Sequence, residues 1–131
     1  MKTIQVKNNN GYFDCKIGIT SEEWLKLLND PKVTYSRTLK ALLEFYKRPN
    51  HTAACSEVNP KKPSSPNALI WRWAQRVQNR LGRFQVLGTD GNTSYWIIPM
   101  TGYSRGGCFV WTVRPELVQA IELYLKQQEE E

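Results

Sequence analysis

The spacing of apolar residues changes along this chain of 131 residues, and that change constrains the fold more than any single motif does. Before residue 19, and again between residues 84 and 113, short β-like segments are separated by turns rich in asparagine, aspartate and glycine. Between residues 20 and 82, and again after residue 114, apolar residues recur at helical spacing. Strands and helices thus occur in separate blocks, which predicts a single α+β domain.

Residues 1–19 are expected to form a β-hairpin extension. Two β-like segments, Thr3–Val6 and Tyr12–Ile19, flank an Asn-Gly dipeptide, which favours the left-handed conformations of a tight turn. Directly afterwards, Thr20 and Glu23 stand at capping-box spacing, where each side chain can accept a hydrogen bond from the other residue's amide. A first helix is therefore predicted to follow Thr20.

Three more helices are expected before residue 83. Ser36, Thr52 and Ser65 are each placed to cap the first turn of one of them. The last and longest of these helices is expected to run from Pro66 to Leu81, with Gly82 as a left-handed C-cap. Its apolar residues share one face, so the opposite face carries Ala68, Arg72, Gln75, Arg76 and Asn79.

Three β-like segments follow the long helix, at Phe84–Leu87, Thr93–Met100 and Cys108–Val113. Asp90-Gly91 is expected to turn the first segment into the second, and a last helix is expected from Pro115. Three helices followed by a β-hairpin and a third strand is the order of a winged helix-turn-helix. The expected architecture is thus an α+β, winged helix-turn-helix-like single domain with a hairpin extension (1–19), a helical part (20–82), a β wing (83–113), and a C-terminal helix with a frayed tail (114–131).

Positive charge is concentrated between Arg37 and Arg83. This segment holds ten basic and two acidic residues and so carries a net charge of +8, whereas the whole chain carries +6. No acidic residue occurs between Glu57 and Asp90, which predicts a helical face of one sign. A cationic region of this kind favours a polyanionic partner, so the sequence predicts a nucleic-acid ligand, with double-stranded DNA as the expected form.

The helix predicted over residues 66–81 is the expected recognition helix, because its polar face carries side chains that can read base edges. Arginine pairs with guanine, and glutamine or asparagine pairs with adenine, through two hydrogen bonds each. Lysines and hydroxyls ahead of this helix are expected to hold phosphate near its first amides. A polar turn at 88–94 and a loop at 102–107 are further candidate contacts. The predicted base-reading residues are Arg72, Gln75, Arg76 and Asn79, and the other predicted contacts are Lys61, Lys62, Ser64, Ser65, Arg80, Arg83, Asn92, Tyr103 and Arg105.

The residue types present favour a binding module over an enzyme. The chain has one histidine, and His51 with Cys55 offers two ligands where a structural zinc site needs about four. Neither a metal nor a cofactor is expected. Two alternatives stay open, namely an adaptor that binds protein through an aromatic patch and does not bind nucleic acid, and a metal-dependent nuclease that uses N-terminal acids. The patch would draw on Trp71, Tyr95 or Tyr103, and the acids are Asp14, Glu22, Glu23 and Asp30.

Cysteine usage and hydropathy indicate the cellular compartment. The three cysteines form no Cys-x-x-Cys pair, which indicates reduced thiols in a cytoplasmic protein. The first ten residues lack the apolar core of a signal peptide. No apolar run approaches the roughly 18–20 residues needed to span a bilayer, so no membrane partner is expected.

Three stretches carry a resemblance to a known family: HTAACSEV at 51–58, ALIWRWAQRVQNRLG at 68–82, and YWIIPMTGYSRGGCFVWTVRPELVQAIE at 95–122. Over roughly residues 20–125 the chain resembles an accessory domain of bacterial restriction systems of the modified-cytosine (Mcr) type. The chain differs from the family pattern after residue 58, where NPKKPSSPN stands in place of a Tyr-Gly turn.

The resemblance implies a domain that helps such a system engage DNA, with an AAA+ or nuclease subunit as its protein partner. It implies no catalytic residue in this chain, because the matched stretches contain none. The motor would belong to another subunit, since this sequence has no Walker loop.

Overall fold

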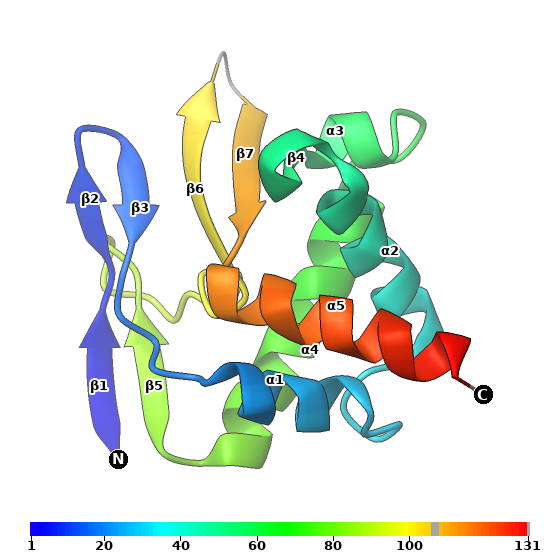
Figure 1. The fold of residues 1–131 in the computed structure, drawn as a ribbon. Helices are drawn as coiled ribbons and strands as arrows, with labels where there is room; N and C mark the ends of the chain where they lie inside the picture. Colours follow the sequence, from blue (N-terminus) through cyan, green and yellow to red (C-terminus); the bar gives the residue numbers. More distant parts are fainter. Residues whose placement is uncertain (106–107, 131) are drawn as a thin grey trace.

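The strands belong to two separate β-sheets in the computed structural model, which describes residues 1–105 and 108–130 (Figure 1). One sheet has five strands in the order β2-β3-β6-β7-β4, and the other pairs β1 with β5. Together with five α-helices they make a mixed α/β domain. The elements are β1 (Lys2–Gln5), β2 (Lys7–Asn9), β3 (Tyr12–Asp14), α1 (Ser21–Leu28), α2 (Ser36–Lys47), a 3₁₀ turn η1 (Pro49–His51), β4 (Thr52–Ala54), α3 (Cys55–Val58), α4 (Ser64–Leu81), β5 (Phe84–Leu87), β6 (Met100–Arg105), β7 (Cys108–Val113) and α5 (Pro115–Glu129).

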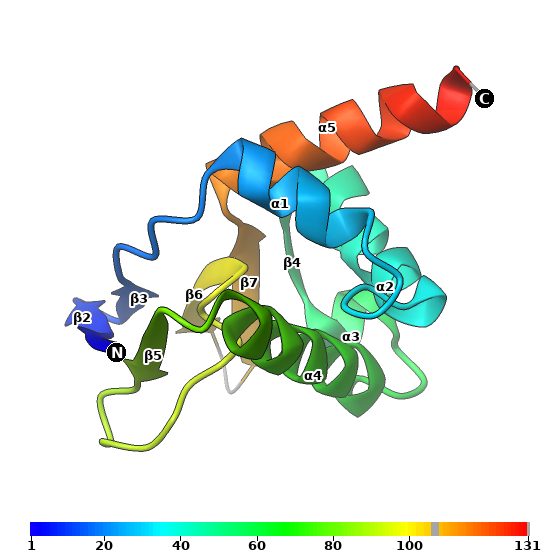
Figure 2. The same cartoon turned by 90° about the horizontal axis from the view of Figure 1, so that it is seen from below.

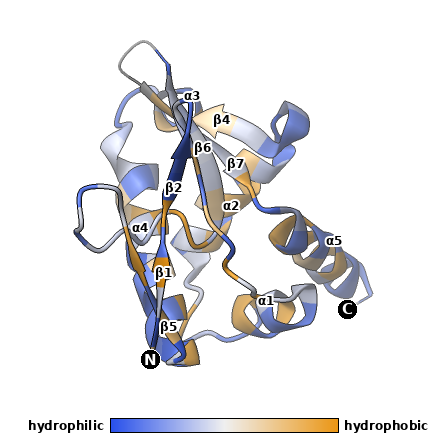
Figure 3. Cartoon of the chain, turned by 90° about the vertical axis from the view of Figure 1, so that its left-hand side faces the viewer, coloured by the Kyte–Doolittle hydropathy of each residue, from blue (hydrophilic) through white to orange (hydrophobic). Residues whose placement is uncertain are grey.

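A hairpin forms at the predicted Asn-Gly turn, but its first strand is β2 (Lys7–Asn9) and not the predicted segment Thr3–Val6. Asn10 and Gly11 adopt positive φ angles of 52° and 90°, as the Asn-Gly turn between β2 and β3 requires. β3 ends at Asp14 instead of Ile19, and Gly18 takes a φ of 75° on the way to α1. β2 is an edge strand, and Figure 3 shows it as hydrophilic, which suits an edge exposed to water.

The segment predicted as the first hairpin strand pairs elsewhere. β1 runs parallel to β5, with Lys2 opposite Phe84, and the Val6 amide donates to the Leu87 carbonyl at 2.9 Å. This pairing buries Ile4 and Val86 in the core. The extension is therefore joined to the end of the long helix, a contact between residues about eighty positions apart that local patterns do not show.

The positions of the helices agree with the prediction, but some of their N-cap residues do not. The capping box of α1 is confirmed, with the Glu23 amide donating to Thr20 Oγ1 at 3.1 Å and the Thr20 amide donating to Glu23 Oε1 at 3.1 Å. The left-handed C-cap at Gly82 is also confirmed, with a φ of 62°. The predicted caps at Ser36 and Ser65 are wrong, because both residues lie inside their helices and the N-cap positions are Tyr35 and Pro63.

Thr52 does not cap a helix either. It begins β4, which pairs with β7, and its hydroxyl lies 2.8 Å from that of Thr112 on the neighbouring strand. The short helix α3 therefore starts three residues later than the predicted cap, at Cys55. At its start Glu57 Oε1 accepts a hydrogen bond from the Ala54 amide at 2.9 Å.

The predicted hairpin between Phe84–Leu87 and Thr93–Met100 is wrong. The expected turn at Asp90-Gly91 forms, but beyond it the two segments share a single bridge, Leu87 with Thr93. Residues 95–99 then form turns, within which Ile97 and Ile98 are both fully buried. The hairpin that does form is β6–β7, and residues 106 and 107 of its predicted loop lie outside the described ranges.

The predicted apolar stripe of α4 lies at the centre of the core. Ile70, Trp73, Ala74 and Val77 are fully buried, and Trp73 packs against Trp24 of α1 with ring centroids 5.6 Å apart. The Trp73 indole donates to Thr34 Oγ1 at 2.9 Å, so its one polar atom is satisfied. Figure 2 shows α1 beside α5 on one side of the domain and α4 on the other. Within the described ranges, no helix combines the length and apolar content needed to cross a lipid bilayer.

Gly102 on β6 provides a test of the close approach of β6 and β7. A Cβ atom there would lie 2.6 Å from the Val110 carbonyl oxygen and 2.9 Å from the Phe109 ring, so Gly102→Ala forces the backbone of β6 and β7 apart. We expect it to lower the free energy of unfolding by about 1–3 kcal/mol in urea denaturation. Gly88→Ala is the control, because its nearest contact is the Asp90 side chain at 3.1 Å. Equal stability of the two variants would contradict the packing of β6 on β7.

Candidate nucleic-acid interface

Two adjoining cavities open between α2 and α4, and together they form what we call the α2–α4 groove. One has a volume of about 320 Å³ and the other of about 290 Å³, and both are lined by Arg37 and Leu69. Their charged side chains are four cations and a single carboxylate, so the groove carries net positive charge. The lining residues are Tyr35, Ser36, Arg37, Thr38, Lys40, Ala41, Glu44, Val58, Asn59, Ser65, Pro66, Leu69, Arg72 and Arg76.

Ser65, Arg72 and Arg76 are the predicted site residues that line this groove. Arg72 is exposed, and nothing in the described parts of the chain forms a hydrogen bond or ion pair with its guanidinium. Gln75 and Asn79 continue the same face of α4, where Asn79 is exposed and Gln75 is half-buried. The N-terminal half of α4 therefore presents an available cation to an external ligand.

Arg76 has a structural role as well as a charge. Its Nε donates to the Val33 carbonyl at 2.7 Å, and its guanidinium lies 3.9 Å from the centroid of the Tyr35 ring. Burial lowers the pKa of Arg76 from its usual range, the Tyr35 hydroxyl raises it, and neighbouring Arg72 lowers it further. Since an arginine pKa lies far above neutral, Arg76 still adds positive charge to the groove. Its position is set by the loop between α1 and α2.

The C-terminal end of α4 differs, because carboxylates from distant segments neutralise Arg80 in its last turn and Arg83 just beyond it. Arg80 forms an ion pair with Asp30, and Arg83 forms one with Glu23 while also donating to the Gly18 carbonyl at 3.1 Å. The expectation of a face of one sign is therefore wrong for this end of the helix. The acids belong to α1 and the loop after it, so no inspection of the sequence around Arg80 could locate them.

The Arg83 guanidinium, by hydrogen bonding to Glu23, lowers the pKa of that carboxyl from its ordinary value of 4.5 to about 2. Hydrogen bonds from the Thr20 amide and hydroxyl act in the same direction, whereas partial burial opposes them. Glu23 thus serves the helix cap and the ion pair together. The ion pair requires the ionised carboxylate, whereas the cap requires only an acceptor oxygen at this position.

The lysines predicted to hold phosphate lie in the loop between α3 and α4. Lys61, Lys62 and Ser64 are all exposed, and the Lys62 amide donates to Asn59 Oδ1 at 3.1 Å. This loop borders the α2–α4 groove, because Asn59 and Ser65 on either side of it are lining residues. The two ammonium groups therefore lie on a segment that can extend the cationic surface.

Three other predicted contacts do not line the groove. Asn92 is engaged within its own turn, where its amide donates to Asp90 Oδ1 at 3.0 Å. Tyr103 stacks on Tyr12 across the sheet, with ring centroids 6.3 Å apart. Arg105 lies 3.7 Å from a carboxylate oxygen of Glu57. The structure therefore does not bring these residues together with Arg72.

Two exposed cations of α2 were missing from the predicted site. Arg37 and Lys40 are three positions apart on one helical face, and both line the α2–α4 groove. The sequence signal was present, because both belong to the basic segment between Arg37 and Arg83. What was missing was the packing of α2 alongside α4, which brings their cations into a common groove with Arg72.

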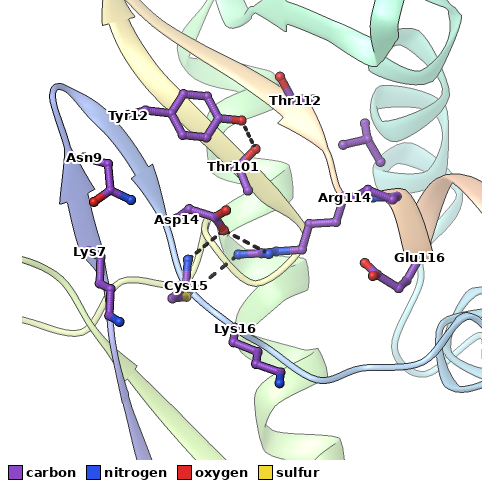
Figure 4. Close-up of a pocket in the computed structure, with 12 residues that line it drawn as sticks. Lys7, Asn9, Tyr12, Asp14, Cys15, Lys16, Thr101, Thr112, Arg114 and Glu116 are labelled. Atoms are coloured by element: carbon purple, nitrogen blue, oxygen red, sulfur yellow. Dashed lines mark hydrogen bonds and ion pairs between the residues drawn. The ribbon is translucent and has the colours of Figure 1, made fainter.

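A separate cleft of about 630 Å³ lies on the outer face of the five-stranded sheet, beside the start of α5 (Figure 4). The Arg114 guanidinium is buried beneath it, donates to the Ile97 carbonyl at 2.8 Å and pairs with Asp14 at 3.2 Å. The Tyr12 and Thr101 hydroxyls lie 2.5 Å apart in the same cleft. Arg114 therefore joins the turn at 95–99 to β3, which gives its side chain a structural role.

Three of the acids that the nuclease alternative would use form ion pairs with arginines in the structure. Asp14, Glu23 and Asp30 each pair with a different arginine. Within residues 1–105 and 108–130, no three side chains of the His, Cys, Asp and Glu types come together in an arrangement suited to a metal ion. His51 lies with Nδ1 2.6 Å from the Tyr46 carbonyl oxygen and stacks on the Tyr46 ring.

Comparison with known proteins adds no relative: no family model, no curated protein and no solved structure matches this chain. A proposal about function therefore depends on the site itself and on the expectations drawn from the sequence.

The Glu23–Arg83 pair predicts how stability depends on pH. The carboxyl has a lower pKa in the folded state, so its contribution is present above pH 4.5 and disappears as the pH falls towards 2. Urea denaturation at a series of pH values should show this decrease, and Glu23→Gln should reduce it. Glu22→Gln, a change at the exposed neighbouring acid, should leave the slope unchanged. A similar slope in wild type and Glu23→Gln would contradict the assignment.

Proposed function

We propose that this protein binds nucleic acid, with double-stranded DNA as the principal ligand, through the α2–α4 groove. The observation that carries the proposal is the convergence of Arg37, Lys40, Arg72 and Arg76 around one groove that has a single carboxylate, Glu44. Cations drawn together from two helices favour a polyanion, because each neutralised phosphate releases condensed counterions.

In this proposal α4 is the recognition helix of a helix-turn-helix-like unit, and α2 supports it. An 18-residue helix is about 27 Å long, which is shorter than one DNA turn of about 34 Å, so its exposed face could lie within one major groove. Arg72, Gln75 and Asn79 are the proposed base-reading residues. Arg37, Lys40, Lys61 and Lys62 are the proposed phosphate contacts. Arg80 and Arg83 take a smaller part, because their charges are already paired.

The resemblance to accessory domains of Mcr-type restriction systems supports a module that recognises a target for an AAA+ or nuclease subunit. The protein would then contribute binding and no catalytic step of its own. A cytoplasmic location, expected from cysteine usage, belongs to the same proposal.

A second candidate function is that of an adaptor that binds another protein. Trp71 of α4 is 40% exposed and meets Tyr95 edge to face, with ring centroids 4.8 Å apart. Exposed aromatic side chains of this kind are enriched at protein interfaces. The wild-type protein should then capture a protein partner that survives nuclease treatment without shifting DNA in a gel, and Trp71→Ala should abolish that capture.

The groove is tested by measuring DNA affinity at several salt concentrations. Lys40→Ala combined with Arg72→Ala should weaken binding of a duplex at low salt by roughly tenfold or more. The slope of log affinity against log salt should become shallower by about one for each phosphate that the protein no longer neutralises. Fluorescence anisotropy with a labelled duplex gives both quantities.

Arg80→Ala is the matched control, because it removes an arginine from the same helix whose charge Asp30 already neutralises. It should change affinity much less than Arg72→Ala does. Equal effects of the two substitutions would contradict the assignment of the N-terminal half of α4. Binding that no substitution in the groove weakens would contradict the proposed function.

A further inference from the structure

A second cavity lies on the other side of the first turn of α4, and we call it the aromatic pocket. Its volume is about 340 Å³, within the range of about 300–1,000 Å³ typical of ligand sites. It adjoins the same helix start as the α2–α4 groove, since Ser64 lines the pocket and Ser65 lines the groove. The residues that line it are Ala54, Cys55, Ser56, Pro63, Ser64, Asn67, Phe109 and Trp111.

The aromatic walls of this pocket are held in place by other rings. Trp96 stacks on Trp111 with centroids 5.8 Å apart and planes 5° from parallel, and it meets Phe109 edge to face at 4.8 Å. Phe13 supports Phe109 at 5.7 Å. Phe109 nevertheless stays partly exposed, so it offers a ring whose position is set before any ligand arrives.

Polar side chains surround the opening of the pocket, and one of its wall residues has a buried donor without a partner. Trp111 is only 3% exposed, yet among the described residues no acceptor lies within hydrogen-bonding distance of its Nε1. Buried donors in this condition are rare in proteins and require an explanation. The first turn of α4 has no side-chain cap, and Ser56, Ser64 and Asn67 supply hydroxyl and amide groups around the opening.

A partly exposed aromatic wall and a set of polar groups around the opening suit a flat heteroaromatic ring with hydrogen-bonding groups on its edge. We propose that the aromatic pocket accepts one unpaired nucleobase, stacked against Phe109, of the nucleic acid bound in the α2–α4 groove. This inference rests on the proposed function, because the groove supplies the backbone binding. Lys61 and Lys62, in the loop that leads into Ser64, are placed to hold the phosphates between the two sites.

The test compares three duplexes of one sequence: a perfect duplex, a duplex with a single bulged thymidine, and a duplex with a bulged abasic residue. Anisotropy titrations should show the bulged thymidine binding roughly tenfold more tightly than the other two, as expected for one stacked base. Phe109→Leu keeps an apolar side chain without a ring and should abolish the preference. Asn67→Ala, at an exposed position of the rim, should reduce it without affecting the fold, whereas Gln119→Ala, at an exposed position of α5, should leave it unchanged.

The outcomes separate this inference from the proposed function. Tight binding of all three duplexes, weakened by Arg72→Ala and independent of the bulge, would overturn the base pocket and leave the groove supported. Equal binding of the thymidine and abasic bulges would also overturn it, because bending alone would then explain the preference. Thymidine monophosphate binding as tightly as the bulged duplex would overturn the assignment of the base to a nucleic acid. Failure of every duplex to bind at low salt would instead reject the proposed function.

Discussion

Burial of the apolar face of α4 is the constraint on which the rest of the structure depends. With Ile70, Trp73, Ala74 and Val77 inside the core, the opposite face of the helix must face solvent. The Trp73 indole, bonded to Thr34, also fixes the loop before α2 against α4. That loop sets the position of α2, and the α2–α4 groove is the consequence of this packing.

The distribution of ion pairs within the fold restricts the candidate interface to the part of α4 that lines the α2–α4 groove. Near the C-terminal end of α4, Asp30 and Glu23 pair with Arg80 and Arg83, and these pairs join the helix to α1. At the middle of α4, Arg72 lines a groove shared with the cations of α2. One helix thus combines a segment whose charge supports the fold with a segment whose charge is available to a ligand.

Local sequence signals correctly predicted the features that contacts between neighbouring residues stabilise. The capping box at Thr20 and Glu23, the turn at Asn10-Gly11 and the C-cap at Gly82 all depend on neighbouring residues, and all were found in the sequence. The pairing of β1 with β5 was not found, because it joins the two ends of a long segment. The strand predicted at Thr93–Met100 was wrong because β propensity does not reveal the turns at 95–99, within which Ile97 and Ile98 are both buried.

The sequence by itself determined the mixed helical and β composition, the apolar stripe of α4 and the excess of positive charge between Arg37 and Arg83, since these follow from residue type and local spacing. Tertiary structure alone decided which arginines are neutralised, which cations of α2 share the groove, and that Phe109 and Trp111 form the walls of one pocket. The physical reason is that ion pairs, grooves and pockets are made by residues far apart along the chain, and only the packing of the core brings them within contact distance.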